Sequence, residues 1–297
     1  MFRVTFTLSR MQRTRSLQHQ FKLGITMNAV ELKQTLADGG YVFGCMLSAM
    51  ASPRFAGALS GSTCDYVIID SEHTSRDRTE IQTLCTMLRS IDIASVVRVP
   101  VPKAEWVAMA LDAGTSGVLV PYCETVAEVE AVVATARFHP LKGAYLKRAM
   151  TEGKLPSDAA GTYLAKRHRH TFVIIGIESE PAYENLDAIL SVPGIDGLFI
   201  GPNDMSTSLG IPDDYDNPRY QQVVADIIKR AEASGVPVMV HQQTIATSAM
   251  AISLGARFVL HSTDAGMLQR AMQSEMNELR ALTGRVRSPV DDKVDTI

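Results

Sequence analysis

Short runs of apolar residues, rich in Val, Ile and Leu, alternate along the chain with longer segments whose apolar positions recur at helical spacing. Eight such runs are typical of buried strands, at residues 42–48, 66–70, 95–100, 117–121, 172–178, 197–202, 236–241 and 258–262. Between them, residues 103–114, 125–138 and 220–235 show helical periodicity, and the last of these ends in a glycine, as helices often do. Strands that alternate with helices in this way predict a parallel sheet.

Eight strand-and-helix units in about 250 residues predict an α/β fold of the (β/α)8 TIM barrel type. A doubly wound open sheet is the alternative, but no GxGxxG sequence follows the first strand, so the dinucleotide-binding version of that fold lacks its motif. The connection at residues 139–171 is long, and loops of that length in a compact domain are usually functional or mobile. We expect one barrel domain over residues 27–284.

The two ends of the chain differ from the rest. Residues 1–26 carry five basic residues and no acidic residue. A transit peptide has this composition, but so does a flexible leader or a start codon assigned too early, with Met27 as the later start, and we favour these two interpretations. The tail at residues 285–297 has little apolar surface to bury and is expected to be loose.

Composition favours a soluble protein that acts on small molecules. The 297 residues are 46% hydrophobic and 21% charged, with a net charge of −3, so no basic surface predicts binding to nucleic acid. The four cysteines are scattered without a CxxC pair, which favours a reducing cytoplasm over a disulfide framework or a zinc site. No apolar run reaches the roughly 18 residues of a membrane span.

Charged side chains gather where the predicted strands end. In a barrel this is the open face on which the catalytic groups sit. Charges at the ends of apolar strands are costly unless they are paired, hydrogen-bonded or bound to a metal, so we expect them to form one functional layer. The residues at these positions are Asp70, Glu72, His73, Arg98, Glu178, Asp204, His241 and Asp264.

Two carboxylates in this layer are candidate metal ligands. Glu178 and Asp204 follow neighbouring strands, and without His or Cys beside them they offer the hard oxygen ligands that Mg²⁺ or Mn²⁺ prefers. The alternative is that each carboxylate caps the helix that follows it. For the pair we prefer the metal site.

Arg98 and His73 are candidates for catalysis. The permanent charge of Arg98 needs an anionic partner, which is either Asp70 or Glu178 in a structural ion pair, or a substrate carboxylate or developing oxyanion. His73 is either a general base or a hydrogen-bonded loop histidine. No lysine lies within or at the end of an apolar strand, which argues against a Schiff-base aldolase. Asp112, in "LDAG", is by itself typical of a helix end.

The sequences "IIDSEH", "VRVP", "LDAG", "VLVPYCET", "IGIES" and "GIDGLFIGPNDMSTSLG", in this order, resemble those of the metal-dependent pyruvate aldolases of the HpcH/HpaI family, of the 2,4-dihydroxyhept-2-ene-1,7-dioate aldolase type. The resemblance covers about residues 42 to 280. It implies a barrel of the phosphoenolpyruvate/pyruvate type that exchanges its C-terminal helix with a partner, commonly within hexamers. It also implies a lyase that cleaves or forms the C3–C4 bond of a 4-hydroxy-2-oxo acid, giving pyruvate or a close 2-keto acid and an aldehyde through an enolate.

By this resemblance, Glu178 and Asp204 match the ligands of a divalent metal ion, either Mg²⁺ or Mn²⁺, with Co²⁺ as a further candidate. Arg98 matches the arginine that stabilises the enolate of pyruvate. His73 matches the base that takes the proton of the 4-hydroxyl group during cleavage.

The resemblance also assigns secondary roles. Asp70 and Asp112 match acids associated with the base, and Gly201 and Pro202 match a segment whose backbone lies close to the bound keto acid. Gly176 stands where glutamine is frequent in the family, so we expect a hydrogen bond in or near the pocket to be missing.

Other departures leave two alternatives open. The loop "KGAYLKRAM" differs from the common family sequence, and His241 stands where a small or apolar residue is usual. One alternative is an acyl-CoA lyase of the malyl-CoA or citryl-CoA type, for which the basic segment at residues 165–170 is a weak hint. The other is a catalytically silent barrel that binds a keto acid.

Overall fold

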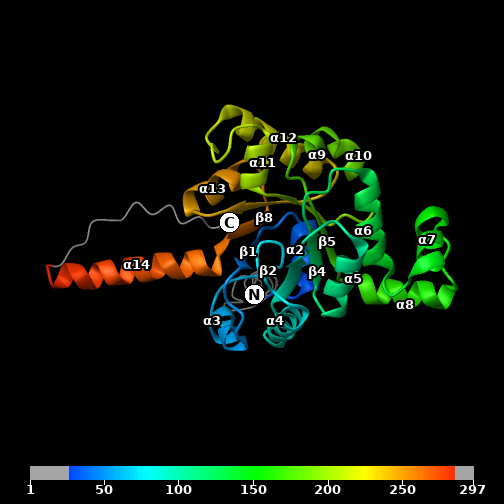
Figure 1. The fold of residues 1–297 in the computed structure, drawn as a ribbon, viewed down its shortest axis with the longest axis horizontal. Helices are drawn as coiled ribbons and strands as arrows, with labels where there is room; N and C mark the ends of the chain where they lie inside the picture. Colours follow the sequence, from blue (N-terminus) through cyan, green and yellow to red (C-terminus); the bar gives the residue numbers. More distant parts are fainter. Residues whose placement is uncertain (1–26, 285–297) are drawn as a thin grey trace, which may run out of the picture.

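Residues 27–284, the part described by the computed structural model, form a closed barrel of eight parallel strands (Figure 1). Each strand pairs with its neighbours in the chain, and the last strand pairs with the first. This confirms the predicted barrel, whereas the expectations for residues 1–26 and 285–297 lie outside the described residues. The strands are β1 (Val42–Leu47), β2 (Tyr66–Asp70), β3 (Ala94–Arg98), β4 (Gly117–Val120), β5 (Phe172–Gly176), β6 (Gly197–Ile200), β7 (Val238–Gln242) and β8 (Phe258–Thr263).

Helices surround the barrel. One of them, α2 (Ala29–Ala37), packs Leu32 and Leu36 against the barrel interior, at the end where the strands begin. Asn28 begins this helix with a capping box that it shares with Glu31. The other helices are η1 (Pro53–Phe55), α3 (Ala56–Ser60), α4 (Arg78–Ser90), α5 (Ala104–Asp112), α6 (Val126–Phe138), α7 (Gly143–Glu152), α8 (Asp158–His168), α9 (Glu180–Glu184), α10 (Leu186–Leu190), α11 (Pro202–Ser208), α12 (Pro218–Ala233), α13 (Ile245–Ser253) and α14 (Asp264–Leu282).

The barrel interior is a packed core. Its large residues include Phe172, Phe199 and Phe258, and the Tyr66 hydroxyl donates a hydrogen bond to the Val259 carbonyl at 2.7 Å. Gly44 makes room for this tyrosine, because a Cβ there would lie 2.5 Å from the Tyr66 ring. The apolar layers leave the carboxyl ends of the strands as the open face, where polar side chains begin.

Two predicted strands end earlier than expected. β5 ends at Gly176 and β6 at Ile200, so Glu178 and Asp204 lie on the segments that follow the strands. After β6, Pro202 begins α11, a position suited to proline because the first turn of a helix does not need its N–H. The two carboxylates are therefore placed at the mouth of the barrel and not within the sheet.

The long connection at residues 139–171 was expected to be a loop but contains the two helices α7 and α8. Gly153, with φ of 64°, ends α7 in the left-handed conformation that glycine favours. The Ser157 side chain then caps α8 by accepting a hydrogen bond from the Ala160 N–H. Both helices project from the barrel on the side opposite α14 (Figure 1).

The last helix, α14, leaves the barrel and points away from it (Figure 1). Only Asp264 and Gly266, in its first turn, are buried. Among the helices of residues 27–284, none combines the length and the apolar character needed to cross a membrane.

Candidate active site

An ion-paired cluster joins the carboxyl ends of β2 and β3. The parallel register places Asp70 opposite Arg98, and Arg98 Nε donates a hydrogen bond to Asp70 Oδ1 at 2.8 Å. A second carboxylate oxygen, Glu72 Oε2, lies 3.2 Å from Arg98 Nη1. Burial by itself raises the pKa of Asp70, but the hydrogen bond and charge of Arg98 outweigh it and hold that pKa below its ordinary value. The arginine is thus fixed in place as a charged group.

Glu72 has a larger part in this cluster than its sequence position indicated. Burial raises its pKa to about 7; the Arg98 charge opposes that rise, while Asp70 and Asp204 add to it. Its Oε2 atom is buried and accepts no hydrogen bond from residues 27–284, because the nearby Arg98 Nη1 is close without being aligned. The sequence indicated this part of Glu72 in one way, through its position directly before His73 at a strand end.

His73 faces the same cluster with its side chain about one-third exposed, and its Nε2 lies 3.6 Å from Glu72 Oε2. Burial, and then the charge of Arg98, lower the pKa of His73 below its ordinary value. The imidazole is therefore neutral at neutral pH and able to accept a proton.

Glu178 and Asp204 converge on one point. A Cβ placed on Gly201 would lie 2.5 Å from Glu178 Oε1 and 2.9 Å from Asp204 Oδ2, so the glycine leaves open a space that both carboxylates face. The other oxygen, Glu178 Oε2, accepts a hydrogen bond from the Tyr122 N–H at 2.6 Å. Burial, together with the charges of Glu72 and Asp204, raises the pKa of Glu178 to about 8.

The capping alternative does not fit these two carboxylates. The side chain that caps α9 belongs to Ser179, which accepts a hydrogen bond from the Ala182 N–H. Asp204 lies in the first turn of α11, at whose start no side chain makes a capping hydrogen bond.

The donor set fits a hard divalent cation. Residues 27–284 contain no cluster of three or more His, Cys, Asp or Glu side chains that could hold a metal ion, so the pair offers two protein ligands. Mg²⁺ is commonly bound in this way, by one or two carboxylates that leave its other positions to water and substrate oxygens. A cation at the Gly201 space would also offset the repulsion between Glu178 and Asp204.

A small cavity of about 90 Å³ opens at the centre of these groups. It brings together four of the residues predicted from the sequence as catalytic or metal-binding, and none of its twelve lining residues is a lysine. The lining residues are Met46, Ser48, Asp70, His73, Arg98, Gly201, Pro202, Asn203, Asp204, His241, Gln243 and Thr263.

Asp264, another polar residue at a strand end, holds a loop. Its carboxylate accepts hydrogen bonds from the backbone N–H groups of Ser48, Ala49 and Met50, at 2.9, 3.2 and 2.5 Å. Asp264 thereby fixes the connection that follows β1. These hydrogen bonds explain why an acidic residue stands at this strand end.

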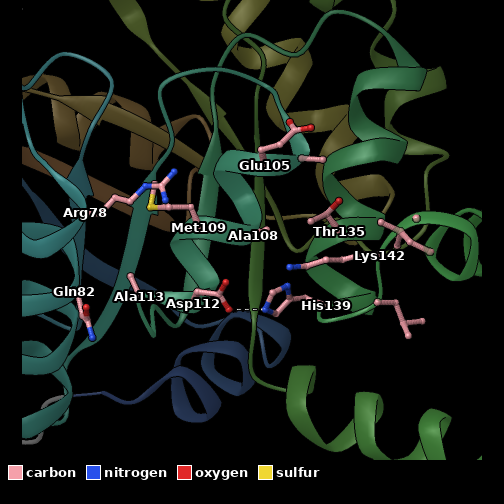
Figure 2. Close-up of a pocket in the computed structure, with 14 residues that line it drawn as sticks. Arg78, Gln82, Glu105, Ala108, Met109, Asp112, Ala113, Thr135, His139 and Lys142 are labelled. Carbon is pink, nitrogen blue, oxygen red and sulfur yellow. Dashed lines mark hydrogen bonds and ion pairs between the residues drawn. The ribbon is translucent and has the colours of Figure 1, made fainter.

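Asp112 lies away from this cavity in the folded structure (Figure 2). It pairs with His139, whose Nε2 is 2.8 Å from Asp112 Oδ1, and lines a separate cavity of about 580 Å³ between α4, α5, α6 and the start of α7. α5 runs back from the barrel mouth, so its last residue points to the opposite end of the barrel. Within one chain Asp112 therefore does not lie beside His73, and its association with the base stays a prediction.

Gly176 leaves room for neighbouring groups, and the missing hydrogen bond expected there stays a prediction. A Cβ there would lie 2.9 Å from both Pro121 Cα and Tyr122 N, and 2.7 Å from Glu178 Oε2. The main chain at Tyr122, whose φ is 33°, occupies the space that a side chain at Gly176 would need. Gly176 thus gives room to the hydrogen bond that orients Glu178.

The basic segment at residues 165–170 does not reach the cavity. It ends α8 and precedes β5, at the N-terminal end of that strand, whereas Glu178 follows the carboxyl end. His168 within it is buried and hydrogen-bonds to the His139 carbonyl. This position removes the sequence-based hint of a nucleotide-binding surface beside the site.

Comparisons with known proteins identify the family of the chain and agree with its fold. A family model described as HpcH/HpaI aldolase/citrate lyase matches residues 44–267. The chain is 31% identical over 246 residues to a 5-keto-4-deoxy-D-glucarate aldolase of Salmonella typhimurium, covering 82% of this chain and 94% of that protein. It also resembles a solved HpcH/HpaI aldolase/citrate lyase family protein from Burkholderia cenocepacia, with 29% identity, a TM-score of 0.73 and coverage of 84% and 98%. A solved HpcH/HpaI aldolase from Desulfitobacterium hafniense gives 26% identity, a TM-score of 0.72 and coverage of 84% and 96%.

Proposed function

The chain belongs to the HpcH/HpaI aldolase/citrate lyase family, whose members are carbon–carbon lyases, and from this premise we propose that it is a divalent-metal-dependent aldolase. The reaction is cleavage or formation of the C3–C4 bond of a 4-hydroxy-2-oxo acid, with pyruvate or a close 2-keto acid and an aldehyde as the two halves. The observation that carries this proposal is the convergence of Glu178 and Asp204 on one space beside Arg98 and His73.

Glu178 and Asp204 would hold the cation, with Mg²⁺ or Mn²⁺ as the preferred candidates. When bound, the cation supplies a positive charge that orients the carboxylate and keto oxygens of the substrate and draws electron density toward them. The Tyr122 N–H holds Glu178 Oε2, which leaves Oε1 directed at the Gly201 space.

Arg98 stabilises the charge that develops on the keto oxygen. Asp70 and Glu72 hold two of its nitrogens, while the one partner of Nη2 among residues 27–284 is the Met46 sulfur at 3.6 Å. A thioether is a weak acceptor, so Nη2 remains able to donate a strong hydrogen bond to the enolate oxygen. In this proposal Arg98 serves both as a structural ion pair and as a donor to the substrate.

His73 acts as the base in the cleavage direction. As the C3–C4 bond breaks, its electron pair passes into the enolate, and the 4-hydroxyl proton moves to the neutral imidazole while the aldehyde forms. Protonation of the enolate at C3 then gives the keto acid. The lowered pKa of His73 supports this role, because the ring is unprotonated at neutral pH.

The name of the Salmonella relative fits the same substrate class. In 5-keto-4-deoxy-D-glucarate, the keto group lies beside a terminal carboxylate and a hydroxyl lies two carbons further along, so counted from that end it is a 4-hydroxy-2-oxo acid. A retro-aldol cleavage would release pyruvate from such a molecule. The class of substrate is therefore part of the proposal, while the aldehyde half of this chain's own substrate is left open.

We further propose that the chain forms a homo-oligomer in which copies exchange α14. An apolar groove of about 700 Å³ lies between α3 and α13, over β1 and β8, where the eighth helix of a barrel would pack. Phe43 and Ile245 are exposed there, at 47% and 75%. The first turns of α14 line one edge of this groove with Met267, Leu268 and Ala271, and the helix then leaves the barrel (Figure 1). The apolar side of the helix is therefore left uncovered, with exposed residues at helical spacing. These residues are Leu268, Met272, Met276 and Leu279.

A second copy of the chain is the occupant that fits this groove. The open groove and the uncovered helix are parts of the same molecule, and one α14 could cover the groove of a partner while its own groove receives the partner's helix. Covering both would remove a large apolar area from water.

The test of the proposed activity is exchange of the methyl protons of pyruvate with solvent deuterium, followed by NMR. We expect exchange with Mg²⁺ or Mn²⁺ and none with EDTA, since exchange reports formation of the enolate without requiring the aldehyde. Glu178→Gln should abolish it. The matched control Glu180→Gln, two residues away in a surface ion pair with Arg219, should not. A wild-type chain that exchanges the C3 protons of neither pyruvate nor a close 2-keto acid, with either metal, would refute the proposal.

A further inference from the structure

His241 is a polar side chain in the cavity that the proposed chemistry does not use. Side chains alternate along a strand, and Met239 packs in the barrel interior, so His241 points inward one step closer to the mouth. It lines the same cavity as Arg98 and Asp204. Burial, and then the Arg98 charge, lower its pKa to about 4, so the ring is neutral at neutral pH.

The hydrogen bonds of His241 define its tautomer. Its Nε2 lies 3.3 Å from the main-chain carbonyl oxygen of Ser262, which can only accept a hydrogen bond, so the proton of the neutral ring is on Nε2. The side-chain amide of Gln243 lies 3.4 Å from the same nitrogen and would present its oxygen to it, since the two ends of an amide are assigned from such contacts. Nδ1 is then a lone-pair acceptor, and no donor from residues 27–284 contacts it.

We propose that Nδ1 of His241 accepts a hydrogen bond from a hydroxyl group of the substrate and thereby selects hydroxyl-bearing substrates. This inference rests on the proposed function and narrows its substrate class. The carboxylate and keto oxygens of a keto acid are acceptors that face Arg98 and the cation site, and pyruvate itself carries only a methyl group at C3. Neither these oxygens nor the methyl group can donate a hydrogen bond to Nδ1 of His241, whereas a hydroxyl group can.

Two parts of the substrate could supply this hydroxyl. One is C3 of the keto acid, as in 3-hydroxypyruvate, and the other is the carbon next to the aldehyde, as in glycolaldehyde. A site built to pair with a hydroxyl disfavours the analogue that lacks it, because the acceptor then loses its hydrogen-bond partner in the substrate. For one such hydrogen bond in a cavity that opens to solvent, we expect a preference of about tenfold.

Three substitutions separate the two nitrogens of the ring. His241→Asn keeps a polar group near the position of Nδ1, and its amide oxygen can accept a hydrogen bond there. His241→Gln keeps a polar group near Nε2 and its Ser262 contact but loses the acceptor at Nδ1. His241→Leu removes both.

Two arms of one experiment identify the source of the hydroxyl. In the first, calorimetry with Mn²⁺ present gives the dissociation constants of pyruvate and of 3-hydroxypyruvate, which requires no turnover. In the second, initial rates are measured for addition of pyruvate to glycolaldehyde and to acetaldehyde. Each arm yields a ratio within one protein preparation, so partial loss of folded protein cancels.

We expect the wild-type chain to prefer the hydroxyl-bearing member in one arm by about tenfold, the Leu and Gln variants to lose this preference, and the Asn variant to retain it. The arm that responds identifies which half carries the hydroxyl. Equal ratios for wild type and His241→Leu in both arms, or no binding of either keto acid, would overturn the inference. A preference in binding without any turnover would refute the aldolase proposal and support this inference, so the two failures are distinguishable.

Discussion

Gly201→Ala is the sharpest test of the cation site, because it adds one methyl group at the point that both carboxylates face. Gly201 has φ of −82°, a conformation that alanine adopts without strain. The substitution therefore changes the available space and not the preference of the backbone.

The size of the effect follows from the distances. The added Cβ would lie 2.5 Å from Glu178 Oε1, and since such contacts are not found below 3.0 Å, that oxygen must move by at least about 0.5 Å. Its freedom is limited, because Glu178 Oε2 is held by Tyr122 at 2.6 Å. Mg²⁺ requires oxygens at about 2.0–2.1 Å in near-octahedral geometry. We expect Mn²⁺ affinity to fall at least tenfold, about 1.4 kcal/mol, and turnover to fall about a hundredfold, as misplacement of about 1 Å does in other enzymes.

The assay is a Mn²⁺ titration by calorimetry together with pyruvate proton exchange. Gly197→Ala is the matched control, since it lies on β6, the strand that leads to Gly201, and its Cβ would make ordinary contacts of 3.4 to 3.6 Å. We expect this control to bind Mn²⁺ like the wild type. Wild-type Mn²⁺ affinity in Gly201→Ala would refute the placement of the cation between the two carboxylates.

Three further predictions concern charge, pH and assembly. Arg98→Lys should slow pyruvate proton exchange at least a hundredfold, because an ammonium group cannot hold the two carboxylates and still donate to the enolate oxygen; a near-wild-type rate would contradict this role. Mn²⁺ affinity measured by titration should rise by up to about tenfold per pH unit below pH 8 and become constant above it. The reason is that Glu178, with a pKa of about 8, must lose its proton before it can bind the cation. An affinity independent of pH would show that loss of this proton does not precede cation binding. Met272→Asp, which adds a charge to the uncovered side of α14, should shift the mass measured by light scattering toward the monomer, whereas Ser274→Asp on the opposite side should not. Equal masses for the two variants would argue against the exchanged helix.

The fold was predictable because its signals are local. Each β-strand appears as a short Val- and Ile-rich run, and alternation with helices identifies a parallel barrel without any long-range information. The errors in the predicted elements lie where a helix begins earlier than expected, or where a mostly polar segment forms helices that its apolar pattern did not indicate. The strand expected at residues 197–202 is cut short by the helix that Pro202 begins, and residues 139–171 hide two helices between capping residues.

The site was predictable only in part. The sequence shows which residues end a strand, but it does not show which end of the barrel a residue at the end of a helix will reach. Arg98 and Asp70 could be expected to meet, since both end neighbouring strands in register. Asp112 could not be placed, because it ends a helix and the return path of that helix carries it to the other end of the barrel. Glu72 was underrated for a different reason, since its raised pKa arises from burial and from charges on other strands.

The barrel mouth divides into sides with different constraints. On the β5 and β6 side, Gly176 and Gly201 leave space that the orientation of Glu178 requires, so a larger side chain at either position would displace the carboxylate. On the β2 and β3 side, Arg98 is enclosed by its ion pairs and is equally restricted. The β7 side is different, because His241 Nε2 makes long contacts with the Ser262 carbonyl and the Gln243 amide, and no donor from residues 27–284 contacts its other nitrogen. Substitution there can change which substrate binds without disturbing the cation site or the arginine, so we expect differences in specificity within this fold to arise on β7.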